Sequence, residues 1–201
     1  MRIYLDSDLI DDSGTTLGSA VAIATERAGC RLLIGVTADG QPVPDDLLAQ
    51  PPVDSPFAAE IHFVSADPVA LVRVTLLEAA DELESSKARQ SAIARKIQLG
   101  DLGGAMPDLA ALLDVWQQVE QCITLSRQVG GIELGELPGG TRFDTIATDL
   151  TQRLAEIRDA LTARDLATLA DILGYDMDEQ ADTWTGVLRD LAAGCRTTEV
   201  A

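Results

Sequence analysis

The stretch EIHFVSADPVALV, residues 60–72, contains the change of secondary structure that decides the fold. Its first half alternates apolar and polar side chains, with Ile61 and Phe63 on one face, which is typical of a half-buried β-strand. Asp67 and Pro68 follow, a pair favoured at helix starts because Asp caps the first turn and Pro fits the first helical position. The sequence therefore predicts a strand that ends near Ala66 and a helix that begins directly after it.

Upstream of this strand, the pattern predicts a small α+β module. Two short apolar runs flank a polar turn at residues 6–8, which is typical of a hairpin. Apolar residues at helical spacing follow, up to Gly29, which is placed to end a helix. Leu47 and Leu48 fit a helical turn inside a proline-rich segment. The predicted elements are strands at 2–5, 9–10, 32–38 and 61–66 and a helix at 15–28. Their order, β-β-α-β-β, fills a first domain of residues 1–67.

Three runs in this module carry a resemblance to a known fold. RLLI at residues 31–34, DGQPV at 39–43 and EIHFV at 60–64 follow one another as a strand, a glycine-containing turn and a final strand. In that order they resemble the second half of ubiquitin-like β-grasp domains. The resemblance implies a β-grasp fold for about a third of the chain. It does not imply conjugation or sulfur transfer, because the chain continues past the last strand without a free Gly-Gly end.

The remainder, residues 68–201, is predicted to be an all-helical hairpin or bundle domain. Apolar residues at helical spacing, together with caps and glycine stops, give helices at about 68–99, 107–129, 141–163, 165–173 and 178–193. Gly100, Gly103 and Gly104 are predicted to separate the first two helices, and Pro107 is predicted to start the second. We expect these two helices to form an antiparallel hairpin. Gly174 is the predicted stop of the 165–173 helix.

The 68–99 helix carries an apolar seam at alternating three- and four-residue spacing. Its members are Val69, Val72, Leu76, Ala79, Leu83, Ser86, Gln90, Ile93 and Ile97. The polar residues Ser86 and Gln90 break the seam in the middle. Thr141 and Asp144 have the spacing of a capping box at a helix start. Residues 100–116 and 164–184 share a loosely similar pattern of residue types, for which chance similarity outweighs a true repeat.

Composition narrows the classes of partner. The chain has 33 acidic and 15 basic residues and a net charge of −18, so its field repels nucleic acid and anionic membranes. No stretch approaches the ~20 apolar residues of a membrane span, and the acidic start does not resemble a signal peptide. The three cysteines are distant from one another, which favours a reducing cytoplasm. Arginine is preferred over lysine, which is typical of a GC-rich bacterium.

No residue pattern predicts a catalytic, cofactor or metal site. Asp6, Asp8, Asp11 and Asp12 form one acidic group, and Asp176, Asp178, Glu179 and Asp182 form another, but neither has the ligand positions of an EF-hand. His62 is the only histidine and is expected at the surface, pointing away from Ile61 and Phe63. Cys30 and Cys122 are expected to be small buried hydrophobes. The glycine runs lack phosphate-loop patterns.

Binding is therefore the predicted function. The first hypothesis is a non-catalytic cytoplasmic adaptor or chaperone-like protein that binds an unknown protein through its helical domain. Candidate partner-binding residues are Trp116, Trp184, Ser86 and Gln90, although core packing is the commoner role of such tryptophans. One alternative is a structural protein that forms a homodimer through the 68–99 helix. Another is an enzyme that uses the acidic groups with a divalent metal.

Overall fold

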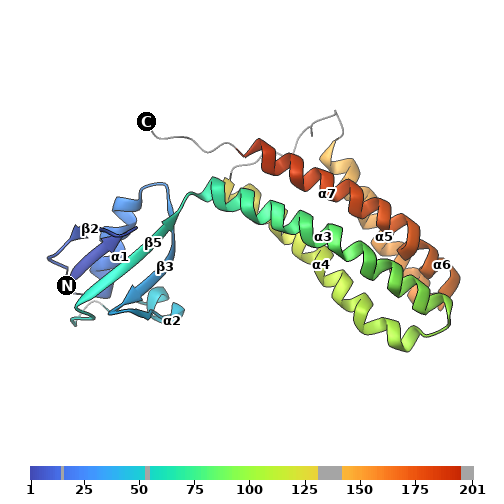
Figure 1. Cartoon of the computed structure of the whole chain (residues 1–201), viewed down its shortest axis with the longest axis horizontal. Helices are drawn as coiled ribbons and strands as arrows, with labels where there is room; N and C mark the ends of the chain where they lie inside the picture. Colours follow the sequence, from blue (N-terminus) through green and yellow to red (C-terminus); the bar gives the residue numbers. More distant parts are fainter. Residues whose placement is uncertain (15, 53–54, 131–141, 196–201) are drawn as a thin grey trace. The chain divides into compact units, whose positions relative to one another are not determined.

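The computed structural model describes residues 1–14, 16–52, 55–130 and 142–195 (Figure 1). The chain divides into two compact units, Met1–Leu71 and Val72–Ala201. The first contains a mixed sheet and the second is helical, as the sequence predicts for an α+β chain. The predicted division after residue 67 coincides with the start of a long helix that enters the second unit.

The described part of the first unit forms one five-stranded sheet. Its strands are β1 (Arg2–Leu5), β2 (Asp8–Asp11), β3 (Leu32–Ala38), β4 (Gln41–Pro42) and β5 (Glu60–Ala66), in the order β2-β1-β5-β3-β4. β1 runs parallel to β5, whereas β1 pairs with β2, and β3 with β4 and β5, in antiparallel fashion. Helices α1 (Leu17–Ala28) and α2 (Asp45–Ala49) complete the unit. The two-residue β4 is the strand that the sequence pattern did not predict, because it is too short to alternate.

Helix α1 supplies the apolar cover of this sheet. A capping box joins Thr16 to Ser19 at its start, and Gly29, at φ 61°, ends it. Ile3, Ile61 and Phe63 are buried in one cluster with the alanine-rich face of the helix. The turn at Gly29 leaves Cys30 exposed, so the expectation that Cys30 is buried was wrong. The helix ends before Cys30 can lie on its apolar face.

The other face of the sheet carries the Tyr4 and His62 rings together with exposed apolar side chains, among them Ile34 and Val64. Tyr4 on β1 lies opposite His62 on β5, and their rings stack with centroids 4.3 Å apart. His62 alternates with the buried Ile61 and Phe63, as the strand pattern predicts, and its Nε2 lies 3.6 Å from a Glu60 oxygen. The imidazole is therefore engaged with the ring and the carboxylate beside it.

Asp6 ties the β1-β2 turn to the last strand. It has a positive φ of 49°, and its carboxylate accepts hydrogen bonds from the Ser65 backbone N–H at 2.7 Å and the Ser65 hydroxyl at 2.5 Å. These bonds, helped by Arg31 at 3.8 Å, lower the pKa of Asp6. A carboxylate in the first acidic group thus has a structural role in the turn.

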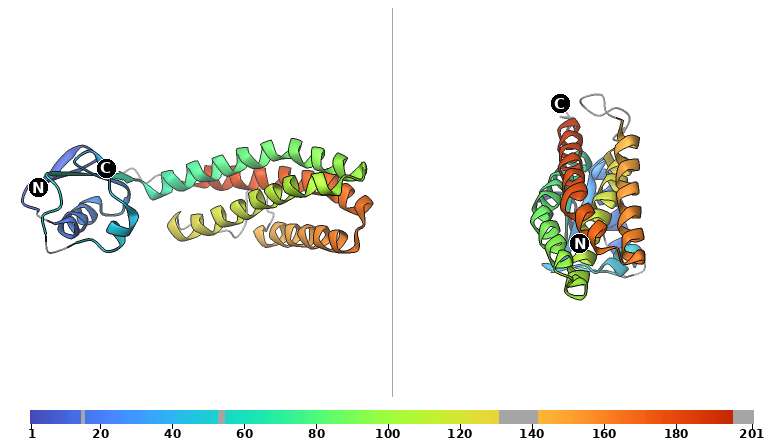
Figure 2. Two further views of the ribbon diagram at one scale, coloured as in Figure 1. Left: turned by 90° about the horizontal axis from the view of Figure 1, so that it is seen from below. Right: turned by 90° about the vertical axis from the view of Figure 1, so that its right-hand side faces the viewer.

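The second unit contains the remaining helices of the described chain. They are α3 (Pro68–Gln98), α4 (Leu102–Gly130), α5 (Phe143–Ala163), α6 (Leu166–Asp171), the π-helical turn η1 (Ile172–Asp176) and α7 (Met177–Gly194). Figures 1 and 2 show α3, α4, α5 and α7 lying alongside one another. One apolar cluster runs through all of them and includes Leu83, Leu112, Trp116, Ile157 and Leu188.

The start of α4 differs from the prediction. It begins at Leu102, so Pro107 lies inside the helix and Gly103 and Gly104 lie in its first turn. The carboxylate of Asp101 accepts a hydrogen bond from the Gly104 N–H at 2.9 Å, and this bond is an N-cap. A Cβ on Gly104 would collide with that carboxylate. The glycines therefore admit a capped helix start, where the sequence pattern indicated a loop.

The predicted stop at Gly174 was also wrong. Gly174 is not among the positive-φ glycines and lies within η1, which passes directly into α7. The chain turns earlier, at Arg164, which has a left-handed φ of 55° between α5 and α6. Asp165 then caps α6 by accepting a hydrogen bond from the Thr168 N–H. The predicted capping box at the start of α5 includes Thr141, which lies outside the described residues.

The apolar seam of α3 is enclosed by its own chain. Leu76, Ala80, Leu83 and Ile97 have almost no exposed surface. Lys87 of α3 binds Asp182 of α7 at 2.6 Å, and Arg189 of α7 lies 3.3 Å from Asp81. This seam is therefore buried within the helical unit, and the homodimer through the 68–99 helix, which stays a prediction, would need another face of that helix.

Candidate functional site: the groove between α4 and α5

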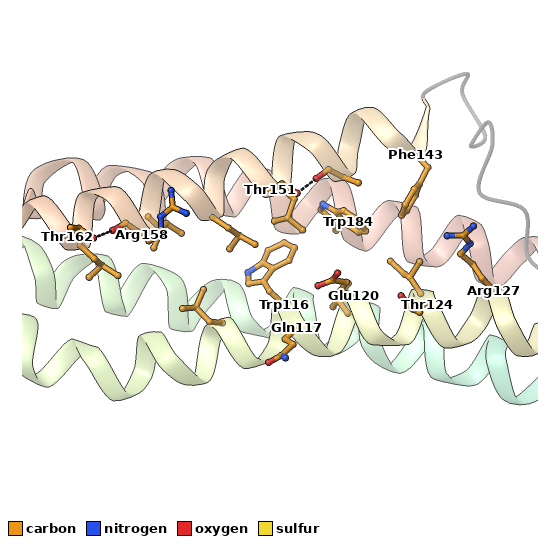
Figure 3. A pocket seen from close by; sticks show the side chains of 18 residues that line it. Trp116, Gln117, Glu120, Thr124, Arg127, Phe143, Thr151, Arg158, Thr162 and Trp184 are labelled. Atoms are coloured by element: carbon orange, nitrogen blue, oxygen red, sulfur yellow. Dashed lines mark hydrogen bonds between the residues drawn. The ribbon is translucent and has the colours of Figure 1, made fainter.

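A groove with a cavity volume of about 720 Å³ lies between α4 and α5 in the helical unit. Its walls are the apolar faces of these two helices, and α7 contributes Trp184 (Figure 3). A volume of this size falls in the range of ligand-binding pockets, which often lie between the helices of a bundle. We refer to it as the α4–α5 groove.

Both tryptophans of the chain line this groove. In Figure 3, Trp116 extends from α4 toward α5, and Trp184 lies beside it near Thr151. Phe143, the first residue of α5, meets Trp184 edge to face with ring centroids 5.6 Å apart. The two indoles thus form an aromatic centre in a wall that is otherwise aliphatic.

Each indole has a hydrogen-bond donor without a partner. Trp116 is 3% exposed and Trp184 is 4% exposed, and neither Nε1 donates a hydrogen bond to a described residue. An indole N–H is a donor only, and a buried donor without an acceptor costs about 1–3 kcal/mol. Both indoles thus carry a buried polar atom that the described chain does not satisfy.

The apolar stripe of α5 is only half covered. Phe143, Ala147, Leu150, Leu154 and Leu161 all line the groove, and all are partly buried. Three further residues of the same helix, Ile146, Ile157 and Ala160, are buried, and Ile157 also lines the groove. The uncovered stripe extends from residue 143 to residue 161, which is about 27 Å along a helix. The chain therefore leaves a long apolar surface that it does not fill.

Exposed polar side chains form the rim. They include Gln117, Glu120, Thr124, Arg127, Arg158 and Thr162. Arg158 lies 2.9 Å from Asp159, its neighbour on α5, while Arg127 forms no ion pair with any residue that the structure describes. Figure 3 places Arg127 near the Phe143 end and Arg158 near the Thr162 end, with Glu120 between them.

The structure brings together two of the four predicted partner-binding residues. Trp116 and Trp184 come from helices that are distant in sequence and meet in the groove. Ser86 and Gln90 are 1% and 0% exposed on α3 and do not line it. The Ser86 hydroxyl donates to the Leu83 carbonyl oxygen at 2.7 Å, while the Gln90 amide has no hydrogen-bond partner among the described residues.

Members of both acidic groups considered for metal binding are engaged in protein contacts. Asp11 accepts hydrogen bonds from Ser13 and from the Gly14 N–H, and Asp182 binds Lys87, whose pKa is raised chiefly by that hydrogen bond. Asp176 lies 3.7 Å from Arg153. Within the described residues, no group of three or more His, Cys, Asp or Glu side chains is placed to hold a metal ion.

Sequence reasoning missed most of the groove. The sequence predicted a helix at 141–163 from its apolar spacing but no site on it, and Arg127 and Arg158 carried no motif. Helical periodicity shows which residues share a face, but not whether another helix covers that face. Only the pairing of the two tryptophans had a sequence signal, because tryptophan is favoured at interfaces.

No helix in the described part of the chain is long and apolar enough to cross a membrane. The chain was also compared with protein-family models, with curated proteins and with solved structures, and none of them matches it.

Proposed function

We propose that this protein is a non-catalytic cytoplasmic adaptor or chaperone-like protein, which binds an amphipathic helix of a partner protein in the α4–α5 groove. The observation that carries the proposal is the half-covered apolar stripe of α5, from Phe143 to Leu161, facing the two indoles. Grooves of this kind take the apolar face of a helix, read through anchors at i, i+3, i+4 and i+7. The stripe is long enough for about five turns.

The open character of the groove favours a polypeptide over a small molecule. Its rim residues Gln117, Glu120 and Thr124 on α4 and Thr151 and Thr162 on α5 are exposed. A small apolar ligand is usually enclosed on most sides, whereas a helix leaves one face in solvent.

In this proposal the first unit is a β-grasp module with a platform role. Two features support a β-grasp assignment: the central parallel pair β1 and β5, and the helix α1 connecting the β1-β2 hairpin to β3. Because β5 leads directly into α3, the module is a fixed part of the chain and not a transferable tag.

Site-specific photo-crosslinking in the cells that make the protein tests the proposal. A photoreactive residue is placed in the groove at Thr124 and, in a matched variant, at its neighbour Leu125. Leu125 is 58% exposed but does not line the groove. We expect the Thr124 variant to give a discrete crosslinked protein and the Leu125 variant to give none.

Purification of that crosslinked protein then permits a direct binding measurement. Because the chain has only two tryptophans and both line the groove, intrinsic fluorescence reports its occupancy. Binding of the captured protein should change this fluorescence in the native chain. Equal crosslinking at Thr124 and Leu125, or capture without a fluorescence change, would contradict groove binding.

A further inference from the structure

The charged residues that line the α4–α5 groove are mostly basic, although the protein as a whole is acidic. From residue 72 onward the chain has 22 acidic and 12 basic side chains, yet two of the three charged residues that line the groove are arginines. Arg127 and Arg158 lie toward opposite ends, and the single acid, Glu120, lies between them (Figure 3). The charge order along the groove is therefore positive, negative, positive.

Local charges outweigh the distant ones at physiological salt. At about 0.15 M salt the screening length is about 8 Å, so acids elsewhere on the surface contribute little to a group held at the rim. Arg127 is exposed and forms no ion pair with a described residue. Arg158 is shared with Asp159, where both side chains are about 70% exposed, so that pair is readily rearranged.

The placement of the two arginines indicates the spacing of the groups that would meet them. Arg127 lies toward the Phe143 end of α5, and Arg158 lies fifteen residues after Phe143, which corresponds to about 22 Å of helix. A helix in the groove would meet the two guanidinium groups with side chains about four turns apart. Guanidinium groups bind carboxylates with particular geometric preference, because their donors match the two carboxylate oxygens.

We infer that the partner helix is acidic at both ends of its apolar stripe, with carboxylates about four turns apart that pair with Arg127 and Arg158. This inference rests on the proposed function and names the chemistry of the partner. It opposes the expectation from the net charge of −18, which favours a basic partner. The middle of the partner helix, opposite Glu120, carries no acid.

Three synthetic peptides test the inference on the full-length protein. Each is an amphipathic helix of about 22 residues with the same leucine stripe and the same central glutamine. They differ only at two positions about fifteen residues apart, which hold glutamate, glutamine or lysine. Binding is followed by the fluorescence of Trp116 and Trp184, which line the groove.

We expect the glutamate peptide to bind about tenfold more tightly than the lysine peptide at about 0.15 M salt, as two rim ion pairs allow. The difference should shrink at about 1 M salt. In the R127Q/R158Q double variant the three peptides should bind alike. An R142Q/R189Q double variant is the matched control, since both arginines are exposed and neither lines the groove.

The outcomes separate the inference from the proposed function. Equal binding of all three peptides, or tighter binding of the lysine peptide, overturns the inference and leaves groove binding intact. If no peptide changes the fluorescence, groove binding by a helix fails, and the inference fails with it. A fluorescence change with palmitate but with no peptide would likewise overturn both, in favour of a small apolar carboxylate.

Discussion

Helices α3 and α5 have similar amphipathic patterns but different surroundings. In α3, nine residues of one face are buried, and ion pairs to α7 close its edges. In α5, only Ile146, Ile157 and Ala160 are buried, and the rest of the stripe faces the α4–α5 groove. The comparison teaches that α3 commits its apolar face to the core of the bundle, whereas α5 leaves part of its apolar stripe uncovered.

The largest difference should appear when a leucine is truncated on each helix. Leu83 of α3 is 0% exposed, so Leu83→Ala should lower the free energy of unfolding by about 2–5 kcal/mol. Leu154 of α5 is only partly buried, so Leu154→Ala should cost about 1 kcal/mol. Denaturant unfolding of both variants measures this. Similar losses would show that the α5 stripe is ordinary core.

The second prediction concerns the polar break in the α3 seam. Gln90 is 0% exposed, and its amide has no hydrogen-bond partner among the described residues. Gln90→Met keeps the shape and removes the buried polar atoms, so it should stabilise the unit by about 1–3 kcal/mol. Thermal unfolding checks the sign, with Gln98→Met at the end of α3, an exposed position, as the control. A loss of stability would reveal a hydrogen-bonding role for the amide.

The third prediction compares the same two leucine variants by their effect on binding, where the variant on α5 should have the larger effect. Leu154→Ala should weaken a helix that occupies the groove about tenfold, because it removes an apolar contact there. Leu83→Ala should leave the affinity of the remaining folded protein unchanged, since Leu83 does not line the groove. Fluorescence titration with the glutamate peptide, at a temperature where both variants are folded, decides between these results.

The smallest effect concerns thiol reactivity. Cys30 is exposed, whereas Cys122 of α4 is 8% exposed, and burial raises the pKa of its thiol above the ordinary 9.0. The folded state therefore keeps this thiol protonated at pH values where the unfolded chain loses the proton. Ionisation of Cys122 leaves the free energy of unfolding unchanged below about pH 9 and lowers it as the pH rises further. Alkylation followed by mass spectrometry should label Cys30 first. Equal rates would indicate that α4 opens readily.

Local signals predicted the elements well where each signal was self-contained. The Asp67-Pro68 start of α3 and the alternation of β5 lie within two residues of the predicted ends. The errors at Pro107 and Gly174 have one cause. A glycine or proline limits or widens the backbone conformations that are possible at its position. Where the helices actually begin and end is set by the Asp101 cap and by the turn at Arg164.

The sequence by itself determined the two-part α+β order, the amphipathic faces and the acidic surface. These follow from side-chain periodicity and composition, which are local or additive properties. Only the tertiary structure decided that Trp116 and Trp184 meet, that Ser86 and Gln90 are enclosed, and that the α5 stripe stays half covered. Burial depends on which helices pack together, and no single helix contains that information.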